Sequence, residues 1–344
     1  ERTEANSTIT WERAKKTNIG MEVSVRKGLL TFEGDYFYEH RSNMLVTPDI
    51  IVPSEYGISL SQVNQGEMEN RGIDFSLGTN FTVSRDIHVS LTGNFTYAKN
   101  KLLQVFESAA TYNNPNRRLT GRPLNTMFGY HAIGYFQVED FDASGNLLPG
   151  IATRPAGKVY PGDIRYEDLN DDEEIDFDDF TVIGHPIVPA IIYGIDGSVR
   201  YKNFEFNFLL QGAEKSSVYK SGGAAWLFDN GYAAYVENLD YWTPENRNAL
   251  NPRPTPAPTT NNKANSSHWL KDASYLRLKN ATLSYRFPSF ISQILKFEDA
   301  TVFVSGQNLL TFTKFTNYDP EIIDVTGRSF PPLKIFSIGL NVSF

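Results

Sequence analysis

The sequence predicts an all-β protein, an antiparallel transmembrane β-barrel, from three observations. Apolar and polar residues alternate with a period of two in segment after segment. Polar connections of very unequal length separate these segments. No run of about 18 apolar residues is present to form a transmembrane helix. Along the final segment, residues 335–344, apolar side chains take every even position, and mostly small or polar ones take the odd positions.

Nine segments fit membrane strands of this kind. They are residues 17–26, 28–41, 70–82, 86–99, 190–201, 203–212, 274–287, 298–312 and 334–344. Residues 274–287 change the phase of their alternation part-way. This predicts a β-bulge near Lys279–Asn280, because one extra residue moves the following side chains to the other face.

The connections between these segments alternate between short and long. Short turns are expected at 26–28, 82–86 and 202–203, with a moderate one at 288–296. Long extracellular loops are expected at about 42–66, 100–189, 213–270 and 313–333. Short periplasmic turns and longer extracellular loops are typical of outer-membrane barrels. Residues 1–344 therefore read as one portion of a barrel.

The odd number of strands predicts that this portion is C-terminal. Bacterial single-chain barrels have an even number of strands and both ends in the periplasm. If Phe344 ends in the periplasm, residues 1–14 lie on the extracellular side and an odd number of strands precedes them. The start at Glu1, without an initiator Met or a signal peptide, fits the same expectation.

Composition argues against several other classes of protein. A net charge of −8 argues against a nucleic-acid surface. The absence of cysteine removes disulfides, thiolate metal sites and cysteine nucleophiles. The five histidines have no metal-ligand spacing, and no nucleophile motif, P-loop or dinucleotide fingerprint is present. We therefore expect no enzyme activity. The alternative class is a soluble all-β carbohydrate-binding or adhesin module, which would bury its aromatic residues between two sheets.

A series of motifs, in order and spacing, resembles the SusC-like TonB-dependent transporters (SusC/RagA family) of the Bacteroidota outer membrane. The motifs are TWERAKKTNIGMEVSV (10–25), GDYFYEHRSNML (34–45), GEMENRGIDFSLG (66–78), TGRPLNTMFGYHAIGYFQ (120–137), PGDIRYEDLNDDEEIDFDDFTVIG (161–184), YWTPENRNA (241–249), SYLRLKNATLSYRFP (274–288), SGQNLLTFTKF (305–315) and YDPEI (318–322).

This resemblance implies a barrel of about 22 strands around a plug; the plug and the first strands are absent from this chain. It implies TonB-dependent import of a large nutrient, an oligosaccharide or a peptide, across the outer membrane. The implied partners are a SusD-like surface lipoprotein, TonB acting through the missing N-terminal region, the lipid of the outer membrane and the barrel assembly machinery. A dimer of transporter–lipoprotein pairs is a further expectation.

An acidic segment, DLNDDEEIDFDD, is the candidate for a metal site. Its oxygen-bearing residues fall at the spacing of a calcium loop, with Glu174 supplying a backbone carbonyl: Asp168, Asn170, Asp172, Glu174, Asp176 and Asp179. The sixth position is Glu173 instead of the usual Gly, and the twelfth is Asp179 instead of the usual Glu. Calcium is the candidate cofactor, and a solvated acidic loop that binds no metal is the alternative.

Aromatic residues supply the remaining candidates. Four of them in the 213–270 loop are expected to contact substrate or the lipoprotein, or to pack within the loop: Trp226, Phe228, Tyr232 and Tyr235. Trp242 and Trp269 are candidates for the girdle at the membrane interface. Phe344, the last residue of an alternating strand, resembles the signal read by the barrel assembly machinery.

Overall fold

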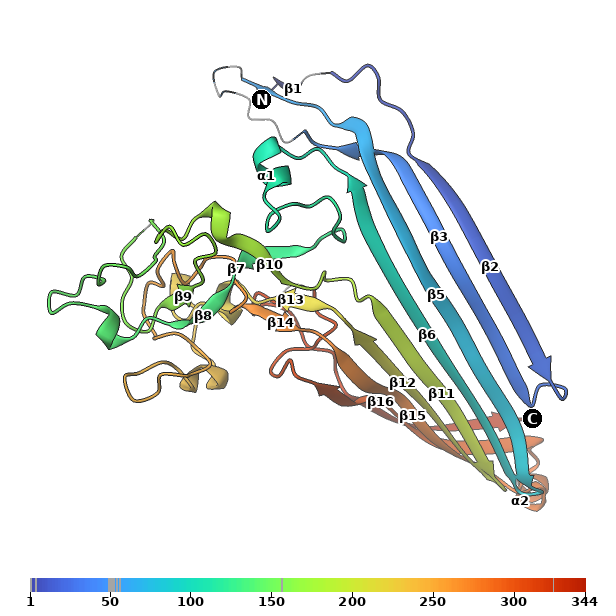
Figure 1. Ribbon diagram of the computed structural model, residues 1–344. Coiled ribbons are helices and arrows are strands. Elements are labelled where there is room, and N and C mark those ends of the chain that lie inside the picture. Colours follow the sequence, from blue (N-terminus) through green and yellow to red (C-terminus); the bar gives the residue numbers. More distant parts are fainter. Residues whose placement is uncertain are drawn as a thin grey trace.

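One antiparallel sheet of nine strands dominates the computed structural model, which describes residues 2–3, 5–48, 53, 55, 57–155, 157–323 and 325–344. Each strand pairs with its neighbours in chain order (Figure 1). The strands are β2 (Arg13–Val25), β3 (Leu30–Val46), β5 (Val63–Ser84), β6 (Ile87–Gln104), β11 (Ile191–Tyr201), β12 (Phe204–Glu214), β15 (Tyr275–Arg286), β16 (Asp299–Thr313) and β17 (Ile335–Ser343). The nine predicted strands are thus confirmed, and β2 and β17 form the two open edges.

Short turns join the strands at one end of the sheet, and long connections join them at the other end (Figure 1). Helix α2 (Ser289–Leu295) lies in the turn between β15 and β16, and α1 (Ala109–Asn113) lies in the longest connection. Within the described residues, neither helix is long or apolar enough to cross a membrane. By the rule for outer-membrane barrels, the end with the long connections is extracellular.

The register separates the two faces of the sheet. One cross-strand row joins seven apolar side chains on seven successive strands: Phe81, Val89, Val199, Phe206, Leu283, Val304 and Ile338. The adjacent row, one residue along each strand, joins seven polar ones: Asn80, Ser90, Ser198, Asn207, Thr282, Ser305 and Ser337. Successive side chains point to opposite faces. One face therefore suits hydrocarbon and the other suits a watery lumen.

These apolar side chains are not sealed in a core. Val199 is 36% exposed, Leu283 50% and Ile338 78%. A soluble two-sheet module would bury such residues between its layers, so the structure contradicts that alternative. A β-bulge interrupts β15 between Leu278 and Asn280, as predicted, and it returns the apolar side chains to the outer face.

Strands β5 and β6 are longer than the sequence pattern predicts. β5 has 22 residues and β6 has 18, whereas β11 and β12 have 11 each. At about 3.3 Å per residue, β5 extends for roughly 70 Å, far beyond an apolar band about 25 Å tall. The added residues, such as 63–69, are mostly polar and do not alternate, so the periodicity gives no signal there. Backbone pairing with β3 and β6 holds them in the sheet.

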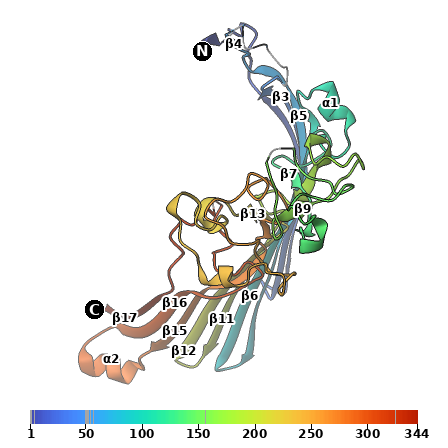
Figure 2. The ribbon, with the colours of Figure 1, turned by 90° about the vertical axis from the view of Figure 1, so that its left-hand side faces the viewer.

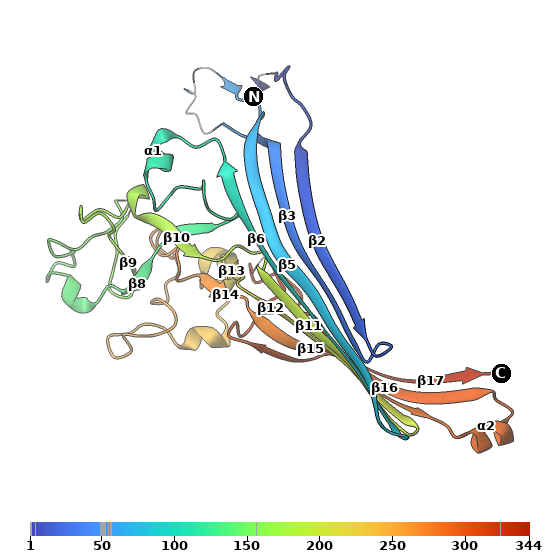
Figure 3. The ribbon, with the colours of Figure 1, turned by 45° about the vertical axis from the view of Figure 1, so that its right-hand side comes forward.

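The long connections pack into a compact body on one side of the upper sheet (Figures 1 and 3). Figure 2 shows the same segments in front of the strands. The short strands of this body are β7 (Met127–Tyr130), β8 (Ala132–Tyr135), β9 (Ile164–Tyr166), β10 (Phe180–Gly184), β13 (Ser217–Tyr219) and β14 (Leu270–Asp272). Strands β1 (Arg2–Thr3) and β4 (Ile58–Ser59) pair with each other near the N-terminus, outside this body. The segment 127–135 forms two separate short strands, because β7 pairs with β10 and β8 pairs with β9.

The principal hydrophobic core lies in this loop body and not in the barrel wall. It contains Tyr130, Tyr135, Ile164, Tyr166, Ile175, Ala225, Trp242, Ala249, Ala264 and Trp269. The prediction that Trp242 and Trp269 mark the membrane interface is wrong. Their side chains are 6% and 3% exposed, and the Trp269 indole Nε1–H donates to the Asn262 carbonyl at 2.7 Å. Packing among the loops removes both rings from the membrane.

Candidate functional site

A cavity of about 640 Å³ opens where β6 rises above its neighbour β11. The β6–β11 pairing ends at Tyr97, opposite Ile191, while β6 continues to Gln104. Above that point, the segment 121–124 takes the place of β11. The Leu102 N–H donates to the Arg122 carbonyl at 2.8 Å, and the Leu124 N–H donates to Asn100 Oδ1 at 2.6 Å.

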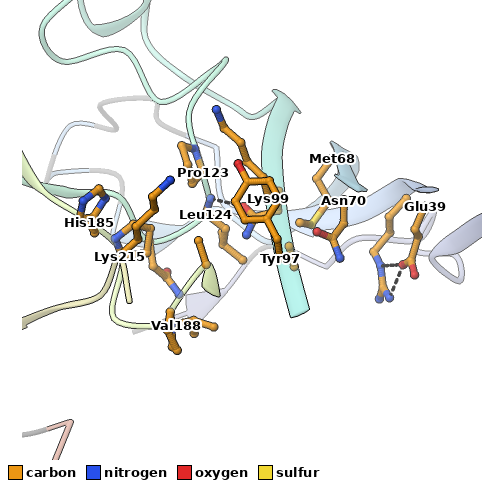
Figure 4. Close-up of a pocket in the computed structure, with 17 residues that line it drawn as sticks. Glu39, Met68, Asn70, Tyr97, Lys99, Pro123, Leu124, His185, Val188 and Lys215 are labelled. Atoms are coloured by element: carbon orange, nitrogen blue, oxygen red, sulfur yellow. Dashed lines mark hydrogen bonds and ion pairs between the residues drawn. The ribbon is translucent and has the colours of Figure 1, made fainter. Parts of the chain in front are cut away.

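The lining of the cavity combines a charged part with an apolar part. Figure 4 shows Glu39 at one end and His185 and Lys215 at the other. Tyr97 and Lys99 lie between them at the edge of β6, in the alternating series that belongs to the apolar face of the sheet. Its apolar side comes from Met68, Pro123, Leu124, Pro186, Val188 and Pro189. Such a lining offers hydrogen bonds to a polar ligand and apolar contact to its carbon skeleton.

A fixed ion-pair chain forms the charged end. The Arg41 guanidinium donates to Glu39 Oε1 at 2.8 Å, and Lys16 Nζ lies 3.4 Å from Glu39 Oε2. Asn70 pairs in register with Glu39 on one side and Asn100 on the other, so the three side chains share the polar face. The polar row of the wall thus continues into the cavity.

A buried polar cluster ties the last extracellular connection to the wall. Arg277 on β15 is 1% exposed, and its guanidinium lies 2.5 Å from Asp319 Oδ2 and also pairs with Glu321. The Tyr275 hydroxyl donates to Glu321 at 2.8 Å. Sequence analysis missed this cluster. The signals were present, since Arg277 sits at a polar-face position and YDPEI carries two acids, but the sequence does not show that they meet.

The four aromatic candidates of the 213–270 loop have different environments. Trp226 packs against the loop core, with Lys263 Nζ 5.4 Å from its ring centroid. The Tyr232 hydroxyl accepts a hydrogen bond from Arg328 at 2.6 Å. Phe228 and Tyr235 are 45% and 40% exposed. Contact of these four residues with substrate or a lipoprotein stays a prediction.

The acidic segment folds into a tight loop organised by Asp168. Its carboxylate accepts N–H groups from Asn170, Asp171 and Glu173 at 3.3, 2.7 and 2.9 Å. Glu173 has φ 66°, the left-handed conformation that calcium loops normally give to Gly at this position. Ile175, 1% exposed, anchors the loop in the hydrophobic core. The backbone therefore has the turn expected of a calcium loop.

The remaining acidic side chains are not gathered around one point. Both Asp179 oxygens accept backbone N–H groups, from Leu169 at 2.6 Å and Asp176 at 2.9 Å. Burial raises the pKa of Asp179, and the charges of Asp168 and Asp172 raise it further. Among the described residues, no group of three or more His, Cys, Asp or Glu side chains is arranged to hold a metal. Calcium also accepts oxygen from amides and backbone carbonyls such as those of Asn170 and Glu174, and calcium binding stays a prediction.

Comparison with known proteins decides the family. Over residues 2–309 the sequence matches the family described as TonB dependent receptor-like, beta-barrel. The chain belongs to this family. It is 29% identical to TonB-dependent receptor P26 of Formosa agariphila, over 99% of this chain and 35% of P26. It is 23% identical to TonB-dependent receptor SusC of Bacteroides thetaiotaomicron, over 98% of this chain and 32% of SusC.

Solved structures agree on the fold. A structure titled "RagAB peptide importer in the 'open-open' state" matches this TonB-dependent receptor chain with a TM-score of 0.73 at 22% identity. The match covers 100% of this chain and 36% of that chain. The chain thus spans about a third of the length of the relatives it matches. The resemblance stated from the motifs is confirmed, and the fold is that of an outer-membrane transporter barrel.

The last residue of this TonB-dependent receptor chain continues the outward-facing series of β17. Phe344 is 85% exposed, and its ring packs edge-on against Phe297 at a centroid distance of 5.1 Å. Phe297 lies in the turn after α2, at the end of the sheet with the short turns. Recognition of Phe344 by the barrel assembly machinery stays a prediction. The family is one of transporters and not of enzymes.

Proposed function

We propose that the complete protein imports a large nutrient, an oligosaccharide or a peptide, across the outer membrane in a TonB-dependent manner. The observation that carries this proposal is the pair of adjacent cross-strand rows, seven apolar and seven polar residues long. A wall of this kind has lipid on one side and an aqueous passage on the other. The cavity between Glu39 and Lys215 lies at the extracellular end of that passage.

A SusD-like lipoprotein is the proposed partner at the extracellular mouth. Support comes from exposed apolar residues on the loop body, where Val236, Leu239 and Leu250 are 84%, 75% and 71% exposed. Exposed apolar side chains that cluster on a surface mark protein contact sites. The RagAB peptide importer has been solved in an "open-open" and a "closed-closed" state. We infer a lid that opens and closes over this mouth, in a dimer of transporter–lipoprotein pairs.

Energy for import would come through TonB, which acts on a region outside this chain. The contribution of the residues described here is to form the passage and to hold substrate near its entrance. No bond is made or broken in this function, because the wall and the cavity only bind and orient their ligand.

Uptake by whole cells tests the proposal. A strain that lacks the full gene would be complemented with the wild-type gene or with an Asn70→Trp, Asn100→Trp variant that fills the cavity. Fluorescent oligosaccharide and peptide pools are the cargo, with an uncoupler of the proton gradient as a further arm. We expect uptake of one pool to require the gene and the gradient, and to fall several-fold in the variant. Uptake of both pools at the wild-type rate in the deletion strain would refute the proposal.

A further inference from the structure

The apolar face of the sheet, which points outward to lipid, carries basic instead of apolar side chains near its extracellular end. On β6 the outward positions from Ile87 to Tyr97 are apolar, aromatic or Gly, and the next two are Lys99 and Lys101. The strand rises about 33 Å from Ile87 to Tyr97, and a strand tilt of about 40° reduces this to about 25 Å of height. This equals the height of the apolar band of an outer-membrane barrel. Lys99 and Lys101 therefore lie just above the hydrocarbon.

Neighbouring strands place two more cations at this level. In one cross-strand row Arg71 lies directly opposite Lys99, and Tyr38 lies opposite Arg71. In the next row Lys101 lies opposite Glu69, Glu69 opposite His40, and His40 opposite Lys15. We call Lys15, Arg71, Lys99 and Lys101 the basic rim. All four side chains are exposed.

The basic rim has an excess of positive charge that the described part of the chain does not neutralise. Two acids face it, Glu69 and Glu67. Glu69 accepts a hydrogen bond from the Tyr38 hydroxyl at 3.4 Å, and Glu67 lies 3.5 Å from His40 Nε2. Within the described residues, none of the four rim cations forms an ion pair. Like charges directly opposite one another on a sheet, as Arg71 and Lys99 are, destabilise it. An anion between them would remove that repulsion.

A tyrosine layer separates the rim from the apolar band. Tyr36 and Tyr97 occupy the row immediately below Arg71 and Lys99, on either side of Ile73. Tyrosine prefers the interface between hydrocarbon and headgroups. The order apolar side chain, tyrosine, cation thus follows the order of layers in a lipid monolayer: acyl chains, interface, phosphate. Figure 4 shows Tyr97 and Lys99 next to each other on β6.

We propose that the basic rim binds the phosphate groups of outer-leaflet lipid headgroups, and so fixes the height and tilt of the barrel in the membrane. The occupant is a lipid and not a soluble anion, because Arg71 and Lys99 lie directly above the tyrosine row on the lipid-facing side of β5 and β6. Basic side chains at a membrane surface bind anionic headgroups through charge and hydrogen bonds. This inference rests on the orientation of the barrel and not on the cargo.

Binding of phosphorylated lipid A to the full-length transporter in detergent, followed by native mass spectrometry, tests the proposal. The test variant is Arg71→Gln, Lys99→Gln, Lys101→Gln. The matched control, Lys27→Gln, Arg85→Gln, Lys202→Gln, removes the same charges at the short-turn end. We expect at least about a tenfold loss of affinity in the test variant and no change in the control. Lipid A treated with phosphatase should bind the wild type as weakly as phosphorylated lipid A binds the test variant.

Two controls separate a loss of lipid binding from a failure to fold and from a change of side-chain shape. A heat-dependent shift in gel mobility reports whether each variant forms the folded barrel, and Lys99→Gln alone replaces the triple variant if that one does not assemble. The charge-conserving variant Arg71→Lys, Lys99→Arg, Lys101→Arg should bind like the wild type. Equal binding by wild type and test variant, or binding that persists after removal of the lipid phosphates, would overturn the proposal.

Discussion

The guanidinium of Arg277, in the barrel wall, lies 2.5 Å from the carboxylate of Asp319, 42 residues further along the chain. This pair and the neighbouring Glu321 fix the connection 314–334 against the polar face of β15. Arg277 is 1% exposed and Asp319 has 14% side-chain exposure, so the pair lies where charge is costly without a partner. The last extracellular connection is thereby part of the wall and not a free loop.

Replacing Arg277 with Met should release this connection. The substitution leaves Asp319 and Glu321 without their shared cation, at a cost of roughly 3 kcal/mol. We expect faster cleavage within 314–334 by a protease added to intact cells, with the barrel itself still folded. Lys279→Met is the control, because Lys279 has 33% side-chain exposure and contacts the same Glu321 at 3.1 Å. Equal cleavage of both variants would argue against a special role for Arg277.

Substitutions at two adjacent residues of β6 test which face of the sheet contacts lipid. Leu91 lies on the apolar face, near the middle of the band, and Thr92 lies on the polar face opposite Asp196. Leu91→Lys should destabilise the barrel by about 2–4 kcal/mol, because the charge enters hydrocarbon. Thr92→Lys should cost little, since the ammonium group faces water and an acid.

Urea unfolding of the full-length barrel in lipid vesicles measures both values. A larger loss for Thr92→Lys than for Leu91→Lys would reverse the assignment of the two faces, and with it the direction of the passage.

The wall was predictable from sequence, whereas most of the site was not. Alternation is a local signal, so residues such as Val199 and Ser198 reveal their faces without knowledge of their neighbours. The phase change at Lys279–Asn280 likewise located a bulge. The loop core depends on contacts over long separations, for example the Tyr135 hydroxyl bonded to the Ala249 carbonyl. No periodicity encodes such contacts, so Trp242 and Trp269 were assigned to the membrane incorrectly.

The acidic loop gives a calcium prediction. Adding calcium should protect residues 160–185 from proteolysis, because a cation would offset the repulsion among Asp168, Asp172 and Asp179. Asp168→Ala should abolish that protection, since it removes both the first ligand and the acceptor of three loop N–H groups. Asp178→Asn is the control, because Asp178 is not among the proposed ligands. Cleavage that is insensitive to both calcium and a chelator would contradict the prediction.

Glu173 offers an independent test of the same loop. Its φ of 66° is strained for a residue with a side chain, and Gly adopts it freely. Glu173→Gly should therefore stabilise the loop by up to about 1 kcal/mol and should leave any calcium dependence in place. Thermal scanning of the loop by pulsed proteolysis, with and without calcium, separates the two effects. Loss of stability in this variant would show that the Glu173 side chain has a role beyond its backbone conformation.

Buried His268 should make the stability of the loop body depend on pH. Its ring packs edge-on against Tyr135 and Trp269, at centroid distances of 5.8 and 4.5 Å. Burial, together with the charges of the nearby Lys271 and Lys220, lowers the pKa of His268 to about 3. The unfolded chain has a pKa near 6.5 for this group, so between about pH 6.5 and 3 the unfolded state binds a proton that the folded state does not.

Stability contributed by neutral His268 is therefore complete above about pH 6.5 and falls as the pH drops below it, by up to about 1.4 kcal/mol per pH unit. We expect protease resistance of the 213–270 connection to decrease between pH 7 and pH 5. In His268→Asn the decrease should be smaller, because Asn keeps a polar side chain of similar reach but does not titrate. Buried Asp163 and Asp179, whose pKa values are raised, act in the opposite direction and are present in both proteins. The difference between the two pH profiles of protease resistance therefore reports the contribution of the His268 imidazole. Identical profiles would show that protonation of His268 does not destabilise the loop body.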